Sequence, residues 1–182
     1  KLKKEKTPKF DISQETKNSI WGIGGFILAV MSILSFTGSA GKAGEVFDYI
    51  LPNELENDRI YLSGEWKSNS DDIEFYGDGE GGSVVLNFTA GEVNIVSDSL
   101  NSQTEEARES RLYESRRVEV FIDGEYIDEE QAGKDVRFSE GEAFLEIDKA
   151  QLYNIFNGDY GNYKLELKFF DKGVSFNAFT FG

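Results

Sequence analysis

The sequence contains no cysteine and no histidine among its 182 residues. These absences exclude disulfide exchange, imidazole acid–base catalysis and zinc sites built from such ligands. Only two prolines occur, Pro8 and Pro52, and both lie outside the segments predicted below as strands, which favours uninterrupted sheet hydrogen bonding. The available chemistry is that of carboxylates, hydroxyls and lysines.

Charge divides the chain into two unequal parts. The formal net charge is -15; residues 1–42 carry seven lysines against three acidic residues, which is +4 and leaves -19 for residues 43–182. An acidic body repels phosphate backbones, so we expect no nucleic-acid partner. The length fits one domain and an appendage.

An uncharged, strongly apolar run of 24 residues follows position 17. As a helix it would be about 36 Å long, enough for a hydrocarbon core of about 30 Å. We therefore predict a basic cytoplasmic tail at 1–17, a transmembrane helix at 18–41, a linker at 42–58 and an extracytoplasmic body, following the positive-inside rule. A cleaved signal peptide is the alternative, because residues 38–40 are small.

The N-terminal segment resembles the first membrane helix of FtsK-type DNA translocases in its lysine-rich start, apolar run and small-residue exit. No GxxxxGK[ST] motif follows it, so motor activity is not expected.

From residue 59 onward, short β-branched and aromatic runs are separated by clusters of Gly, Asn, Asp and Ser. This pattern predicts a mainly β domain over 59–182, an antiparallel sandwich or jelly roll. The predicted strands are 59–66, 72–76, 83–89, 92–97, 117–123, 135–138, 142–147, 163–170 and 174–181.

Alternation within 117–123 and 163–170 predicts strands with one buried and one solvated face. Asp123-Gly124 predicts a tight hairpin turn after the first of them. Residues 97–117 form a long polar stretch, which we interpret as a loop with room for a short helix.

The last strand breaks strict alternation. Val174 and Phe176 share one face, whereas Phe179 and Phe181 fall on the other unless a bulge near Asn177 shifts the register. In either case we expect this strand to lie inside the sandwich and not at its edge.

Five segments occur in an order that resembles the thioredoxin-like C-terminal domain family, the jelly-roll module of DipZ-type membrane thiol-disulfide proteins. These segments are LPNELENDRIYLSGEW (51–66), SVVLNFTAGEVNIVSD (83–98), VEVFIDGEYI with AGKDV (118–136), QLYNIF (151–156) and FTFG (179–182).

The resemblance covers residues 47–182 and implies a galactose-binding-like β-sandwich of the kind found in carbohydrate-binding modules, working outside the cytoplasm. In this sequence we expect a membrane helix in the place of the family's usual thioredoxin domain, and residues 1–182 contain no cysteine that could exchange disulfides.

Two sets of side chains are candidate sites. Asp71, Asp72, Asp78 and Glu80 lie in a glycine-rich stretch and could supply oxygen ligands to Ca²⁺; their spacing does not match an EF-hand, and ordinary turn chemistry is the alternative.

Aromatic rings near strand ends could stack on sugar rings, and the candidates are Tyr160, Tyr126, Tyr76 and Trp66. For each ring, packing against the core is the alternative. Acidic pairs adjacent in sequence point apart on a strand, so we expect no glycosidase chemistry and no enzyme.

These observations predict a membrane-anchored, extracytoplasmic, non-catalytic module that recognises an envelope glycan or a protein. The alternative is a structural accessory subunit of a membrane complex, related to thiol-disulfide exchange, division or secretion.

Overall fold

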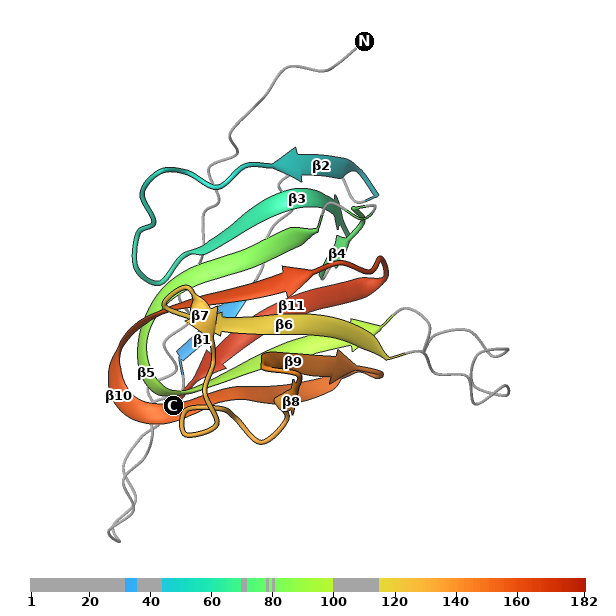
Figure 1. Ribbon diagram of the computed structural model, residues 1–182. Helices are drawn as coiled ribbons and strands as arrows, with labels where there is room; N and C mark the ends of the chain where they lie inside the picture. The colour runs from blue at the N-terminus through green and yellow to red at the C-terminus, as the bar shows by residue number, and fades with distance from the viewer. Residues whose placement is uncertain (1–31, 36–43, 70–71, 78, 80, 100–114) are drawn as a thin grey trace, which may run out of the picture.

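A computed structural model describes residues 32–35, 44–69, 72–77, 79, 81–99 and 115–182 (Figure 1). None of the described residues is helical, and every pairing between their strands is antiparallel, so the mainly β prediction is confirmed. The strands are β1 (Ser32–Ser35), β2 (Val46–Tyr49), β3 (Ile60–Ser68), β4 (Ile73–Phe75), β5 (Gly82–Ser99), β6 (Arg116–Ile122), β7 (Glu125–Tyr126), β8 (Arg137–Ser139), β9 (Glu142–Ile147), β10 (Gln151–Phe169) and β11 (Val174–Phe181).

Two long strands, β5 and β10, pair with each other and bend together from one layer into the other (Figure 1). The first half of β5 pairs with β3 and its second half with β11. The front layer therefore holds β2, β3, β6, β8 and β9 with one half of each long strand. The back layer holds β11 and β1 with the other halves.

Glycines allow the long strands to approach closely at the bend. A Cβ built on Gly91 would lie 3.3 Å from the carbonyl oxygen of Gly158, a tight contact that would require the neighbouring strand to shift slightly. The backbone carbonyl of Gly182 accepts hydrogen bonds from the amides of Gly91 and Glu92, each at 3.0 Å. The C-terminus is thus attached to the bend.

The two layers are joined along both sides, which gives the fold a barrel-like closure. On one side β4 pairs with both β3 and β11. On the other side the chain before β8 hydrogen-bonds to the first half of β10: the Gly133 amide donates to the Ile155 carbonyl at 3.1 Å, and the Asn157 amide donates to that of Gln131 at 2.8 Å. These contacts satisfy backbone groups that an open sheet would leave unpaired.

The core between the layers is rich in aromatic rings. Trp66 is fully buried, packs edge-on against Phe75 and Phe169 with ring centroids 5.2 and 5.0 Å away, and donates its indole N–H to the Ser63 carbonyl at 2.8 Å. The alternating residues Val118, Val120 and Ile122 of β6 and Leu165, Leu167 and Phe169 of β10 are buried as predicted.

Strand β11 has the bulge that its sequence suggested. The register with β5 shifts between Phe176 and Ala178, so Val174, Phe176, Phe179 and Phe181 are all buried. The strand lies inside the back layer, with β5 along one edge and with β4 and β1 along the other. The predicted position of this strand inside the sheet is confirmed, and of the two registers that the sequence left open the bulged one is present.

The sheet begins earlier in the chain than residue 59. Strand β2 lies in the predicted linker and pairs with β3, and β1 lies within the predicted transmembrane helix. At Ser32–Ser35 the helix prediction is wrong, because the backbone there pairs with the edge of β11 at Ala178–Phe181.

The rest of the predicted helix and the basic tail lie outside the described residues. The described part of the chain contains no helix that is long and apolar enough to cross a membrane.

Candidate functional site

Side chains from four strands gather on the outer surface of the front layer. They occupy the positions between the buried residues of β6, β9 and β10, together with the end of β7. In the strand register Glu119 lies opposite both Lys168 and Phe144, and Phe121 lies opposite Tyr126. We call this group the sheet-face cluster; its members are Arg117, Glu119, Phe121, Tyr126, Glu142, Phe144 and Lys168.

An aromatic stack forms the apolar part of the cluster. The rings of Tyr126 and Phe121 are 4.3 Å apart between centroids and inclined by 25°, and the ammonium nitrogen of Lys168 lies 4.2 Å from the Phe121 centroid. A ring and an ammonium group cannot share one face of Phe121 at these distances, so Phe121 lies between them. This packing leaves Phe121 only 8% exposed although it points away from the core.

The hairpin turn after β6 sets the position of Tyr126. Asp123 and Gly124 both have positive φ, 53° and 92°. They form the tight turn that the sequence predicted, and this turn places Ile122 opposite Glu125 in the hairpin. The Asp123 carboxylate also accepts a hydrogen bond from the Lys164 amide at 2.8 Å, which ties the turn to β10.

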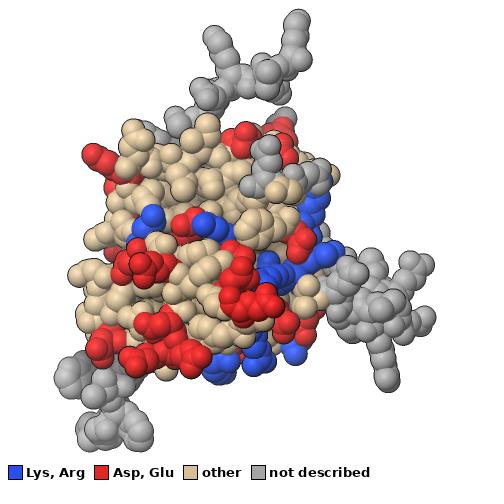
Figure 2. Space-filling model, viewed as in Figure 1, with Lys and Arg blue, Asp and Glu red and all other residues tan. Residues whose placement is uncertain are grey.

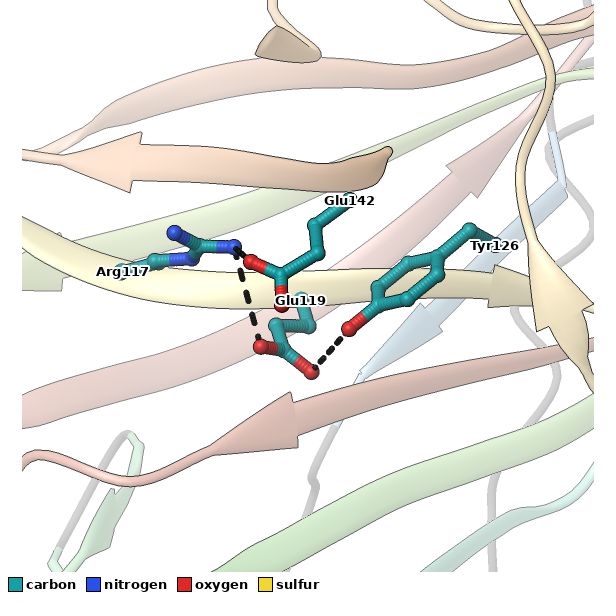
Figure 3. A network of polar contacts seen from close by, with 4 residues as sticks. All are labelled: Arg117, Glu119, Tyr126 and Glu142. Carbon is teal, nitrogen blue, oxygen red and sulfur yellow. Dashed lines mark hydrogen bonds and ion pairs between the residues drawn. The ribbon is translucent and has the colours of Figure 1, made fainter. Parts of the chain in front are cut away.

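A polar network surrounds the stack (Figure 3). The Tyr126 hydroxyl donates to Glu119 Oε2 at 3.0 Å, and Arg117 pairs with Glu142 and, at 3.8 Å, with Glu119 Oε1. The Arg117 guanidinium also lies 4.0 Å from the centroid of the Phe144 ring. Two carboxylates and the Phe144 ring therefore hold the Arg117 guanidinium in place.

Solvent reaches this network. The side chains of Arg117 and Glu142 are 38% and 43% exposed, whereas that of Glu119 is 15% exposed. Burial raises the pKa of the Tyr126 hydroxyl; the hydrogen bond to Glu119 and the charges of Glu119 and Glu142 raise it further, and Arg117 offsets part of the effect. The hydroxyl therefore stays protonated near neutral pH and donates to Glu119.

The four aromatic residues suggested by the sequence do not form one site. Tyr126 is in the sheet-face cluster. Tyr160 is 78% exposed at the bend of β10, and Tyr76 is 40% exposed after β4, with the Lys172 ammonium 4.9 Å from its ring centroid. Trp66 is fully buried in the core, so its prediction as a ligand-binding residue is wrong.

The predicted calcium ligands are only partly within the described chain. Asp72 Oδ1 accepts a hydrogen bond from the Asn69 side chain at 2.6 Å, and the Asn69 amide donates to the Asp72 carbonyl at 3.0 Å, which is turn chemistry. Asp71, Asp78 and Glu80 lie outside the described residues, as do 100–114 of the long polar loop. The described residues hold no group of three side chains placed to bind a metal ion.

Sequence reasoning did not identify Arg117, Glu119 and Glu142 as members of a site. Alternation in β6 does place residues 117 and 119 on the solvated face. Their contact with Glu142 and Tyr126 depends on how β6 pairs with β9 and β7, which a single sequence does not specify.

The fold belongs to the class of mainly β domains with antiparallel strands and a barrel-like closure, and it is similar to part of a solved structure. It resembles part of a family two carbohydrate esterase from Cellvibrio japonicus, with a TM-score of 0.50 and 12% sequence identity. The match covers 83% of this chain and 33% of the esterase chain, so this chain corresponds to about one third of that protein. At this identity the likeness concerns the fold alone.

Comparison of the sequence with family models identifies the family of this chain. The family described as the thioredoxin-like C-terminal domain matches residues 28–182, so the chain belongs to this family. The match includes β1 and β2, in agreement with their place in the sheet. A comparison with curated protein sequences gave no match.

Proposed function

We propose that this chain is a non-catalytic binding module that recognises a glycan of the cell envelope through the sheet-face cluster. The observation that carries the proposal is the Tyr126–Phe121 stack next to the solvent-accessible Arg117–Glu142 pair. Aromatic rings provide an apolar surface for a sugar ring. Charged groups beside it make strong, directional hydrogen bonds to hydroxyls.

The other exposed tyrosines support the proposal less well. Tyr160 stands at the bend between glycines 158 and 161, and Tyr76 is already covered on one side by the Lys172 ammonium. Tyr126 combines an aromatic ring with three charged neighbours within one network. This combination of apolar and polar recognition is typical of a small-ligand site.

Glycan-array binding of the purified chain tests the proposal, with variants measured on every glycan that the wild type binds. We expect Tyr126→Ala to weaken binding by about tenfold or more, as removal of a central aromatic contact usually does. Tyr160→Ala is the control, because it removes an exposed ring outside the cluster and should leave affinity unchanged.

Two results would contradict the proposal. Loss of glycan binding in Tyr160→Ala but not in Tyr126→Ala would move the site to the bend. Binding to no glycan, together with stable co-purification of a membrane protein, would favour the accessory-subunit role. A thermal melt of each variant separates loss of binding from loss of folding.

We also propose an extracytoplasmic location with a membrane anchor before the domain, and β1 sets a condition on the anchor. Residues 18–31, which precede β1, would form a helix of only about 21 Å, short of a hydrocarbon core of about 30 Å. Anchoring through residues 18–41 therefore requires Ser32–Ser35 to leave β11. Carbonate extraction of membranes containing the full chain tests the anchor. We expect the chain to stay in the membrane pellet; its release into the supernatant would contradict the proposed anchor.

A further inference from the structure

The charges of the sheet-face cluster already balance one another. It holds two basic and two acidic side chains, and both basic groups have partners within the cluster. Arg117 is shared between Glu142 and Glu119, and the Lys168 ammonium lies on the Phe121 ring. A ligand anion would therefore have to replace one of these contacts.

Charged side chains of both signs surround the cluster. Glu146 is exposed on β9, and Glu166 on β10 accepts a hydrogen bond from the Ser83 hydroxyl at 2.9 Å, whereas Arg137 is exposed on β8, in register opposite Phe144. Figure 2 shows acidic side chains spread among basic ones over the lower half of this face. The whole chain carries a formal charge of -15, which adds a long-range repulsion for anions.

We propose that the sheet-face cluster takes uncharged saccharides and rejects saccharides that carry carboxylates. This inference rests on the proposed glycan-binding function. Neighbouring hydroxyls of a neutral sugar can donate to the Glu142 carboxylate and accept from the Arg117 guanidinium, while the ring of the sugar contacts Tyr126. Both ion pairs of Arg117 then stay intact.

A uronate ligand would disturb the same contacts. Its carboxylate would approach Glu119 and Glu142 as a like charge, or it would displace Glu142 from Arg117. The first arrangement is repulsive, and the second leaves the Glu142 carboxylate without its partner. Either arrangement lowers affinity relative to the neutral sugar.

The test is affinity electrophoresis of the full chain in gels that contain one polysaccharide each. The neutral set is hydroxyethylcellulose, laminarin, galactomannan and pullulan; the acidic set is carboxymethylcellulose, polygalacturonate and alginate. We expect retardation by at least one neutral polymer and about tenfold weaker affinity for every acidic polymer. The difference should narrow with added salt, because screening weakens the repulsion.

A matched pair of variants separates the local effect from the charge of the whole chain. Glu142→Gln breaks the ion pair between Arg117 and Glu142 and removes a carboxylate, so it should raise affinity for acidic polymers relative to neutral ones by several fold. Glu129→Gln removes the same charge from an exposed residue outside the cluster and should behave like the wild type.

The outcomes distinguish the inference from the function on which it rests. Equal or tighter binding to an acidic polymer overturns the inference and leaves glycan binding intact. An identical response of Glu142→Gln and Glu129→Gln also overturns it, because the selection then does not arise in the cluster. Retardation by none of the seven polymers overturns the proposed function and this inference with it.

Discussion

The bulge in β11 makes a single-residue deletion informative. Asn177 is the extra residue between Phe176, which lies opposite Ser97, and Ala178, which lies opposite Val96. Its removal leaves a regular ladder in which Phe176, Phe179 and Phe181 still face the core. Removing Ser175 instead makes Val174 and Phe176 neighbours in the chain, so only one of these two buried side chains can face the core.

The Ser175 deletion should lose a large part of the stability of a domain. Exposing one buried valine or phenylalanine costs roughly 1.5–3 kcal/mol in transfer free energy alone. The cavity left behind brings the cost for Phe176 to roughly 3–5 kcal/mol, as for a Phe→Ala substitution. The free energy of unfolding of a whole domain is only about 5–15 kcal/mol. We therefore expect the Ser175 deletion to be strongly destabilised and the Asn177 deletion to stay folded.

Urea denaturation followed by tryptophan fluorescence measures the effect, because Trp66 is fully buried in the core. Asn177→Ser is the control, since it keeps the residue count and should cost less than about 1 kcal/mol. Phe179→Ala should resemble the Ser175 deletion, at about 3–5 kcal/mol. An Asn177 deletion that loses as much stability as the Ser175 deletion would refute the assignment of the bulge.

Two further predictions concern the stability of the domain. Burial raises the pKa of Tyr49 from 10.0 to about 12, so between these values the unfolded chain loses this proton first. The contribution of Tyr49 to stability should be constant below about pH 10 and fall toward pH 12, so the measured fall should be shallower in Tyr49→Phe. Equal slopes of the urea midpoints against pH in the two proteins would contradict this. Deleting residues 1–35 leaves the Ala178–Phe181 backbone edge without β1. We therefore expect a lower melting temperature, and self-association in size-exclusion chromatography through the unpaired edge. A monomer with an unchanged melting temperature would show that β1 does not stabilise the domain.

Local patterns in the sequence predicted the features that depend on near neighbours. The alternation of β6, the Asp123-Gly124 turn and the bulge at Asn177 each follow from a few consecutive residues. Strand β2 was missed because its four residues follow a small-residue stretch that is typical of a linker. The first part of β10 was missed because Gly158, Asp159 and Gly161 interrupt its apolar pattern.

The candidate site was only partly predictable for a related reason. Tyr126 was noticed because it is an aromatic residue beside a turn, whereas its polar partners come from β6 and β9 and depend on strand register. For Trp66 the same sequence feature led to a wrong prediction, because an aromatic residue near a strand end can equally belong to the core. Burial by distant parts of the chain decides between the two.

The bend of β5 and β10 affects how the molecule comes apart. Each of these strands contributes hydrogen bonds to both layers, so neither layer can lose its tertiary packing while the other keeps a complete set of strands. The layers are consequently one cooperative unit, and backbone amides in the front and back halves of β5 should share a single opening free energy in hydrogen exchange. A ligand that stabilises the front layer would then slow exchange in β11 as well, although β11 lies in the opposite layer.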